Sequence, residues 1–189
     1  MAEQPGTPSA RQTELLESAY RYVLLHGLAD LSLRPLAAAI GSSPRVLLYL
    51  FDSKDGLIRA LLARARTDEL AMLEQIRTTD PGMIGTAERV WGWLADPGHR
   101  GLSRLWLESY SRSLVATDGP LAGFAAGTVA DWLMVLADAQ PVGERESTEA
   151  IARRVGVLAV LRGGLLDLLA TDDLSRIDVA VRQALATFG

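Results

Sequence analysis

Cysteine is absent from this 189-residue chain, and histidine occurs only twice, as His26 and His99. Without cysteine the chain can form no disulfide, no thiolate nucleophile and no zinc–thiolate site. Two histidines leave almost no basis for an imidazole cluster, so we predict no metal site. Apolar runs of the roughly 18 residues that span a membrane are lacking, and residues 1–9 lack the basic start and apolar core of a secretory signal. We therefore expect a cytoplasmic protein with no membrane partner.

Lysine is also scarce: it occurs once, as Lys54, against 18 arginines. The composition, 49% hydrophobic and 22% charged, is that of an ordinary globular protein. The formal net charge of -4 argues mildly against a surface covered by nucleic acid. However, residues 1–51 hold four arginines and four acidic residues, so the acidic excess lies entirely in the remainder. A neutral N-terminal part can still carry a local positive face.

What the chain does have is helical periodicity, since apolar residues recur at intervals of three and four, and no alternating strand pattern occurs. The sequence therefore predicts an all-α protein of about nine helices. Their ends carry capping and stop signals: Ser9 with Gln12 forms a capping-box pattern, Gly27 is a stop signal, and Asp80-Pro81-Gly82 is the clearest break. The expected helices are 9–27, 32–40, 44–50, 53–78, 86–95, 101–116, 121–139, 147–170 and 174–188.

Two of these helices are short and joined by a turn that contains Gly41, and a longer helix precedes them. This is the layout of a helix-turn-helix DNA reader. In such a unit the second helix is fixed by buried side chains, here Leu47 and Phe51, and offers its other face to a major groove about 12 Å wide. Arginine can pair with guanine, small apolar groups can touch a thymine methyl, and a tyrosine hydroxyl can reach phosphate. The residues expected on that outer face are Pro44, Arg45, Val46 and Tyr49.

The segment SLRPLAAAIGSSPRVL at 32–47, followed by Phe51, Ser53-Lys54-Asp55 and Leu57, resembles the N-terminal signature of the tetracycline-repressor (TetR) family. The resemblance extends without gaps over about residues 12–62, and beyond them it is one of architecture. It implies an all-helical homodimer with a helix-turn-helix DNA-binding domain in 1–55. The larger helical domain, 56–189, is then expected to bind a small molecule and to dimerise. In such proteins the ligand alters the separation of two DNA-reading heads.

The resemblance also implies roles for individual residues of the N-terminal part. Arg34 is expected to contact a base or a phosphate, and the base-reading face is expected at Pro44, Arg45 and Val46. Tyr49 and Lys54 become phosphate clamps, although simple surface or packing roles remain open for Arg45, Tyr49 and Lys54. The sequence departs from the family at Leu48 and Leu50, which leaves two of the family's phosphate contacts unsupported. The predicted DNA-binding set is Ser32, Arg34, Ser43, Pro44, Arg45, Val46, Tyr49 and Lys54.

Aromatic residues gather in the C-terminal part, where three neighbouring helices are expected to carry Trp91, Trp93, Trp106, Tyr110, Phe124 and Trp132. Such a cluster can line an apolar pocket or fill the core. Trp106 and Tyr110 share a helix face, whereas Trp91 and Trp93 point about 200° apart. We predict a pocket for an apolar or aromatic effector and interpret nearby polar residues (Arg104, Glu108, Arg112 and Asp131) as solvated. The predicted lining residues are Trp106, Tyr110, Phe124 and Trp132.

The last two expected helices carry an almost continuous apolar surface, interrupted by Arg162-Gly163-Gly164. Because glycines weaken a helix by up to about 1 kcal/mol each, we expect a packing reason for the pair. One reason is close backbone approach across a two-fold axis, and the alternative is packing within the chain. A dimer would place two heads about 34 to 36 Å apart, one helical turn of DNA. The predicted interface residues are Val155, Leu158, Arg162, Leu165, Leu166, Leu169, Val181 and Leu185.

Enzyme signatures are lacking, because no Ser/His/Asp arrangement is suggested and no glycine-rich loop follows a strand. Asp172 and Asp173 lie at the expected start of a helix, where negative charge interacts favourably with the helix dipole. We predict no catalytic residue and no cofactor. The sequence instead predicts a DNA-binding regulator, most often a repressor, that leaves a palindromic operator when a ligand binds. The alternative is a helical ligand sensor or scaffold that no longer binds DNA, as the neutral N-terminal part, Leu48 and Leu50 would allow.

Overall fold

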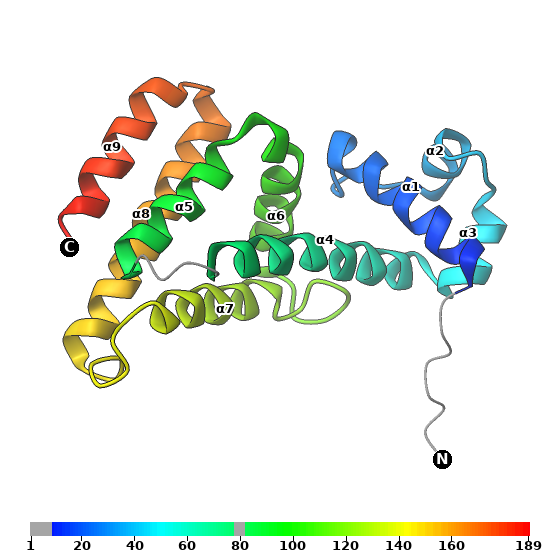
Figure 1. Cartoon of the computed structure of the whole chain (residues 1–189). Helices are drawn as coiled ribbons and strands as arrows, with labels where there is room; N and C mark the ends of the chain where they lie inside the picture. The colour runs from blue at the N-terminus through cyan, green and yellow to red at the C-terminus, as the bar shows by residue number, and fades with distance from the viewer. Residues whose placement is uncertain (1–8, 78–81) are drawn as a thin grey trace, which may run out of the picture.

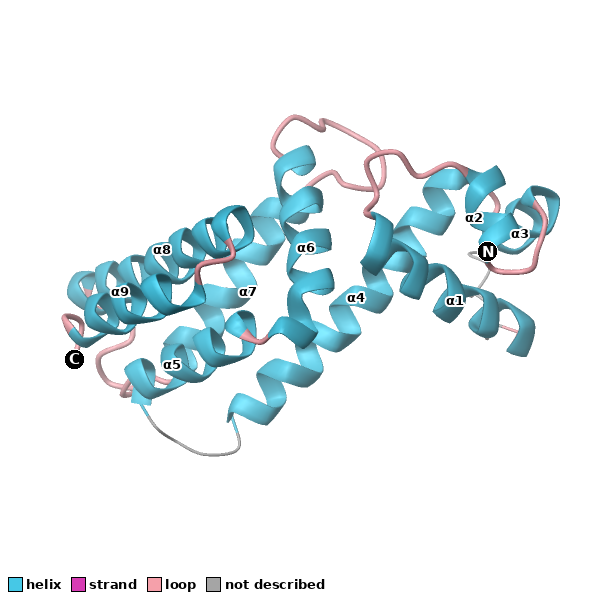
Figure 2. Ribbon diagram, turned by 90° about the horizontal axis from the view of Figure 1, so that it is seen from above, coloured by secondary structure: helices cyan, strands magenta, loops and turns pink. Residues whose placement is uncertain are grey.

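The computed structural model describes residues 9–77 and 82–189 of the chain (Figure 1). Within these ranges every regular element is helical, which confirms the all-α prediction (Figure 2). The expected break at Asp80-Pro81 lies outside the described residues. The helices are α1 (Ala10–His26), α2 (Leu33–Ala39), α3 (Pro44–Phe51), α4 (Lys54–Arg77), α5 (Gly82–Ala95), η1 (a 3₁₀ helix, Pro97–His99), α6 (Arg100–Ser113), α7 (Phe124–Asp138), α8 (Thr148–Thr171) and α9 (Leu174–Ala186).

Helix α1 begins and ends where the sequence predicts. The hydroxyl of Ser9 accepts a hydrogen bond from the backbone N–H of Gln12 at 3.1 Å, and Gly27 ends the helix at φ 77°. The expected capping box forms only in part, because the Gln12 side chain does not return to Ser9. Its Nε2 donates to the carbonyl of Leu50 at 2.8 Å. Gln12 therefore ties the start of α1 to the end of α3.

The turn between α2 and α3 follows from local signals. Gly41 adopts φ 65°, a conformation that costs glycine little, and Pro44 occupies the first turn of α3. The Ser43 hydroxyl accepts from the N–H of Val46 at 3.3 Å and so caps α3. Leu36 and Leu47 are buried in a core shared with α1. The three helices thus form one unit, the head, at one end of the molecule in Figure 1.

Helix α4 joins the head to the rest of the chain. Its first turns place Leu57 and Leu61 in the core of the head, and its later turns place Met72 and Leu73 in the core of α5, α7, α8 and α9, which with α6 we call the body. In Figure 1 it runs as one rod from beneath α3 toward α5. The expected boundary between residues 55 and 56 therefore falls in the first turn of a helix that serves both parts.

A polar cluster strengthens the contact between α1 and α4. The Tyr20 hydroxyl donates to Asp68 Oδ2 at 2.8 Å, and the Arg64 guanidinium pairs with both Glu17 and Asp68. Burial and the hydrogen bond to Asp68 raise the pKa of Tyr20, and hydrogen bonds to Glu17 and Asp68 raise the pKa of Arg64. Both shifts keep the groups in the protonation state that makes these contacts.

The body is built around Trp91, which is fully buried and donates from Nε1 to Asp178 Oδ1 at 2.9 Å. Helix α8 passes over this indole at Gly164, where a Cβ would meet the Trp91 ring at 3.1 Å and would overlap Val181. Packing within the chain, one of the two alternatives for the glycine pair, therefore accounts for Gly164. Gly163 faces open space.

Several helix ends differ from the prediction. Helix α5 begins at Gly82, four residues before the expected start, and η1 precedes α6 because the Asp96 side chain accepts from the N–H of Gly98 at 2.7 Å. Helix α7 begins at Phe124 rather than at residue 121, since Gly123 adopts the left-handed conformation with φ 75°. No helix within 9–77 or 82–189 is both long and apolar enough to cross a membrane.

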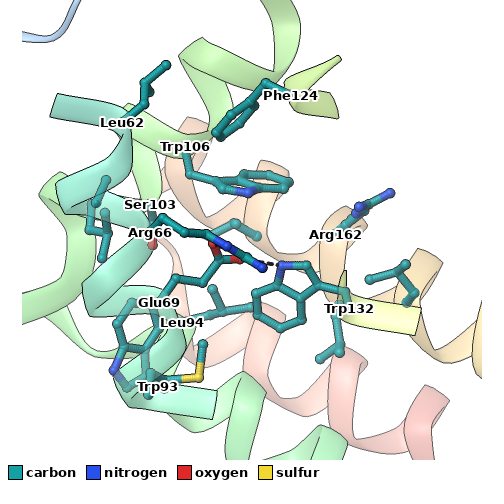
Figure 3. Close-up of a pocket in the computed structure, with 16 residues that line it drawn as sticks. Leu62, Arg66, Glu69, Trp93, Leu94, Ser103, Trp106, Phe124, Trp132 and Arg162 are labelled. Carbon is teal, nitrogen blue, oxygen red and sulfur yellow. Dashed lines mark hydrogen bonds and ion pairs between the residues drawn. The ribbon is translucent and has the colours of Figure 1, made fainter. Parts of the chain in front are cut away.

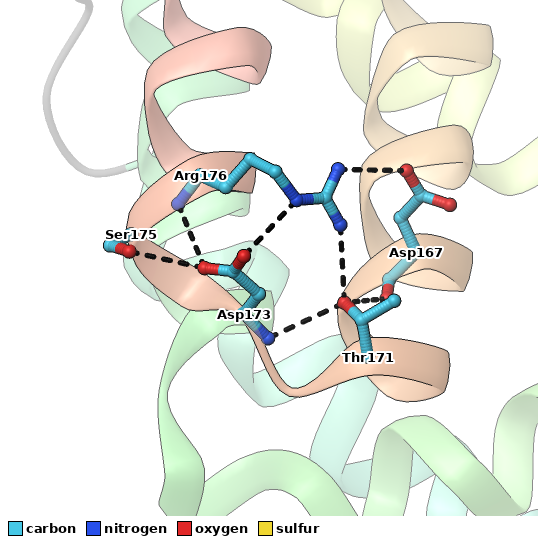
Figure 4. Close-up of polar contacts among 5 residues, drawn as sticks. All are labelled: Asp167, Thr171, Asp173, Ser175 and Arg176. Atoms are coloured by element: carbon cyan, nitrogen blue, oxygen red, sulfur yellow. Dashed lines mark hydrogen bonds and ion pairs between the residues drawn. The ribbon is translucent and has the colours of Figure 1, made fainter.

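The turn between α8 and α9 is held by side chains (Figure 4). Asp173 Oδ1 accepts from the N–H of Arg176 at 3.2 Å and from the Ser175 hydroxyl at 3.1 Å. Asp173 Oδ2 accepts from Arg176 Nε at 3.1 Å. The backbone bond from Arg176, followed by the Ser175 bond, lowers the pKa of Asp173. This carboxylate therefore caps α9, as expected for an acidic residue at a helix start.

Candidate nucleic-acid interface and ligand cavity

Helix α3 presents an exposed face held by a buried one. Leu47 and Phe51 are 1% and 5% exposed, whereas Tyr49 is 83% exposed. With Ser43 capping its start and Gln12 binding the Leu50 carbonyl near its end, the helix is fixed at both ends. Arg45 and Val46 are exposed and Pro44 is half-buried. The exposed face of α3 in the structure therefore consists of Pro44, Arg45, Val46, Leu48 and Tyr49.

Unpaired cations surround this face. Arg34 near the start of α2, Arg45 on α3 and Lys54 at the start of α4 are all exposed. Among residues 9–77 and 82–189 no carboxylate pairs with any of the three, whereas Arg11 on α1 pairs with Glu14 at 2.8 Å. Free guanidinium and ammonium groups are suited to bind phosphates, because they need not first break an internal ion pair. Of the two predicted serines, Ser43 caps α3, and the exposed Ser32 makes no capping hydrogen bond.

A cavity of about 60 Å³ lies in the body and is lined by side chains of α4, α5, α6, α7 and α8 (Figure 3). Three of the four predicted pocket residues, Trp106, Phe124 and Trp132, line it. The fourth, Tyr110, is not in its wall and instead stacks on Trp106 with ring centres 5.1 Å apart. The full lining is Leu62, Ala65, Arg66, Glu69, Met72, Trp93, Leu94, Leu102, Ser103, Trp106, Phe124, Trp132, Leu158, Leu161, Arg162 and Leu165.

One side of the cavity carries a closed polar network. Glu69 Oε1 accepts from Trp132 Nε1 at 2.8 Å, and Glu69 Oε2 accepts from Arg66 Nη1 at 2.9 Å. Arg66 also pairs with Asp131 at 2.6 Å, so our interpretation of Asp131 as solvated is corrected. In Figure 3 Arg66, Glu69 and Trp132 lie together in the cavity wall. Every charged group in this network already has a protein partner.

Arg162 lies elsewhere in the cavity wall. Its guanidinium carbon is 5.8 Å from the Trp106 ring centre and 5.1 Å from that of Tyr110, and Nη1 donates to the Tyr110 hydroxyl at 3.4 Å. Burial lowers the pKa of this guanidinium. The sequence placed Arg162 in a dimer interface because it shares a helix stripe with Val155 and Leu166. The structure corrects this assignment, since α6 covers the side chain.

The other predicted interface residues divide into two groups. Leu158, Leu165, Val181 and Leu185 are at most 5% exposed, so the prediction that they meet a second subunit is corrected: the chain's own core already covers them. Val155 and Leu166 are about half exposed, and Leu169 is half-buried. The exposed face of α8 carries Ile151, Val155, Ala159, Gly163 and Leu166.

Helix α6 also contacts the head directly. Glu108 Oε2 accepts from the backbone N–H of Leu28 at 2.8 Å, and Arg112 Nη1 donates to the carbonyl of Leu28 at 3.3 Å. Two turns before Glu108, Gly101 lies so close to α1 that a Cβ would be 2.8 Å from the Leu24 carbonyl oxygen. Our interpretation of Glu108 and Arg112 as solvated is therefore corrected. We call this contact between α6 and residues 24–28 the α6 joint.

The chain was compared with known proteins. No protein-family model matches the sequence, and no curated protein matches it. Solved structures do match. A TetR-family transcriptional regulator from Cytophaga hutchinsonii superposes with a TM-score of 0.78 at 16% identity, covering 98% of each chain. A TetR-family regulator from Rhodococcus sp. gives 0.76 at 20% identity, covering 95% of this chain and 99% of that one.

A third solved structure, the multidrug binding protein EbrR complexed with imidazole, gives a TM-score of 0.68 at 25% identity, covering 94% of this chain and 89% of that one. In all three the similarity extends over both the head and the body. The resemblance that the sequence showed in residues 12–62 therefore holds for the whole architecture. The chain has the fold of the TetR-family transcriptional regulators.

Proposed function

We propose that this chain is a DNA-binding transcriptional regulator that reads a palindromic operator with α3 and is released by a small molecule bound in the body. The observation that carries the proposal is the outer face of α3. It is fixed by buried Leu47 and Phe51, it exposes Arg45 and Tyr49, and the cations around it have no internal partner. A face with these properties suits a major groove flanked by phosphates.

The exposed side of α8 offers a surface for the dimer that the proposal requires. Val155 and Leu166 leave large apolar surfaces uncovered, and Ala159 and Gly163 between them would permit close approach of a second helix. A two-fold contact here would join two bodies and carry a head on each. Two heads reading adjacent major grooves about 34 to 36 Å apart would require a palindromic site.

The proposed release follows from elements that serve two parts of the molecule. Helix α4 lines the cavity with Arg66 and Glu69 and packs its first turns into the head. Helix α6 lines it with Ser103 and Trp106 and reaches the head through the α6 joint. A ligand that favours one arrangement of these helices would shift the population of head positions toward one that no longer fits the operator. The function we propose is therefore repression relieved by a ligand.

A single pair of substitutions tests the DNA part of the proposal. Arg45→Ala is expected to weaken binding to a sequence selected from random duplexes by about 1 to 3 kcal/mol and to relax the preference at one position. Lys54→Ala is expected to weaken selected and random duplexes alike and to reduce the salt slope by about 2, because the dimer loses one phosphate contact on each head. Fluorescence anisotropy with labelled duplexes at several NaCl concentrations measures both effects.

Arg153→Ala is the matched control, because it also removes one exposed arginine but lies on α8, away from the head. It is expected to bind DNA as the wild type does. If Arg45→Ala and Lys54→Ala also bind like the wild type, the proposed docking of α3 is wrong. If the wild type binds no duplex at any salt concentration, the chain is the ligand sensor without DNA binding, an alternative to which exposed Leu48 would fit.

A further inference from the structure

The cavity carries hydrogen-bond donors that the protein does not use. The Ser103 hydroxyl, the Trp106 Nε1–H and the Nε and Nη2 groups of Arg162 are buried and have no partner among the described residues. All three residues line the same cavity. Ser103 and Trp106 share one face of α6, and the Arg162 guanidinium lies over the Trp106 ring. Trp106 and Arg162 therefore present their unused donors to the same part of the cavity, whereas Ser103 lies on the other side of Trp106 (Figure 3).

Buried donors of this kind require acceptors, because a polar group without a partner is costly away from water. Indole and guanidinium groups donate only and cannot accept. The guanidinium of Arg162 also carries a positive charge that no carboxylate in residues 9–77 or 82–189 neutralises. The chemistry that fits this corner of the cavity is an anion with acceptor oxygens, of which a carboxylate can take two parallel bonds from one arginine.

A cation fits the cavity less well, although tryptophan rings can bind cations. The only carboxylate in the cavity wall is Glu69, and both of its oxygens already accept from Trp132 and Arg66. Arg162 would repel a second positive charge. The cavity therefore lacks a free negative group with which to hold a cation.

The remainder of the wall sets the shape of the ligand. Away from Ser103 and Arg162 it is made largely of aromatic and aliphatic side chains, among them Trp93, Phe124 and Leu161. A volume of about 60 Å³ is well below the about 150 Å³ of a cavity that holds benzene, so it favours a short aliphatic chain over a ring. Resting on the proposed function, which makes this cavity the effector site, we propose that the effector is a small amphipathic monocarboxylate. Its carboxylate binds Arg162 and Trp106, and its apolar end lies among the aromatic side chains.

Three compounds of the same skeleton test the assignment: butyrate, butyramide and butylammonium. Binding to the full-length protein without DNA is measured by isothermal titration calorimetry and by tryptophan fluorescence, to which Trp106 and Trp132 in the cavity wall contribute. The carboxylate is expected to bind at least tenfold more tightly than the amide, and the ammonium compound more weakly still. The same measurements on propionate and pentanoate cover ligands of other chain lengths.

Substitutions then locate the carboxylate. Arg162→Gln is expected to weaken binding of the carboxylate at least tenfold and to leave binding of the amide within about threefold. Trp106→Phe, which removes the indole N–H, is expected to act in the same direction with a smaller loss and covers the case that Arg162→Gln does not fold. Arg104→Gln, which removes an exposed arginine of the same helix that does not line this cavity, is the matched control and is expected to bind all three compounds like the wild type.

Equal affinity for acid and amide, tighter binding of the ammonium compound, or no effect of Arg162→Gln and Trp106→Phe would each overturn the assignment. So would the absence of binding across all three chain lengths. Duplex binding is measured separately on the same preparations, without ligand. Loss of the DNA proposal would leave the carboxylate preference and its dependence on Arg162 intact, whereas failure of the carboxylate assignment would leave duplex binding intact.

Discussion

The head and the body use the same residue type in opposite surroundings. On the head, Arg34 and Arg45 are exposed and have no partner within the described residues. In the body, Arg162 is also without a carboxylate partner among the described residues, but it is half-buried against Trp106 and Tyr110, and burial lowers its pKa. An exposed arginine is hydrated and screened by salt, so it contributes to binding only as one of several. A buried one has few alternatives to a ligand and can act alone.

The largest difference is expected in salt dependence, between DNA binding by the head and carboxylate binding at Arg162. With Arg34 and Lys54 on each head contacting phosphates, a dimer would neutralise about four of them, so affinity for duplex DNA is expected to fall about 10²-fold between about 50 and 200 mM NaCl. Carboxylate binding at Arg162 is expected to change less than about threefold over the same range, because burial limits screening. Anisotropy and calorimetry at matched salt concentrations measure the two. A carboxylate affinity that fell as steeply as DNA binding would place Arg162 in open solvent.

The next largest difference is expected in the free energy of unfolding, between substitutions in the body and in the head. Trp91→Ala is expected to lower the free energy of unfolding by about 3 to 5 kcal/mol, because it leaves a cavity beneath Gly164 and removes the bond to Asp178. Arg34→Ala on the head is expected to stay within about 0.5 kcal/mol of the wild type. Urea unfolding at one fixed protein concentration measures both, since a dimer makes stability depend on concentration. An equally large loss in Arg34→Ala would show that this head cation has a structural role.

The smallest effect on stability is expected where an exposed arginine already has a carboxylate partner. Asp173 pairs with Arg176, and its lowered pKa means that the ionised form stabilises the folded state. This contribution is complete above the carboxyl's ordinary pKa of about 4 and is lost as the pH falls through the lower folded value. The melting temperature of the wild type should therefore slightly exceed that of Asp173→Asn at pH 7, with a difference that disappears in more acidic buffer. Asp118→Asn, which removes an exposed loop carboxylate, is the matched control.

The head could be predicted from sequence because its determinants are local. Ser9, Gly27, Gly41 and Ser43 act within a few residues of their own positions, and the structure shows each of them at a helix end or in a turn. The face of α3 followed in the same way from the period of an eight-residue helix anchored by Leu47. What the pattern missed was the partner of Gln12, which lies 38 residues away at Leu50.

The cavity could be predicted only in part, because its wall is assembled from distant segments. The expected divergence of Trp91 and Trp93 is confirmed, since Trp91 fills the core and Trp93 lines the cavity. Arg66 and Glu69 have the spacing of an ordinary surface ion pair, and only the approach of α7 with Trp132 and Asp131 makes them part of the wall. Arg162 shares its stripe with exposed residues, and no local signal says that α6 covers it. The period of a helix predicts which face a residue occupies but not which other helix packs against that face.

The solitary lysine described above has a practical consequence. Because Lys54 is exposed at the start of α4 and no other side chain carries a primary amine, acylating reagents can modify one side chain at the edge of the DNA-reading face. A fluorophore coupled there would report on that face while leaving the arginines untouched. Protection of this amine by bound duplex would give a footprint that needs no mutation.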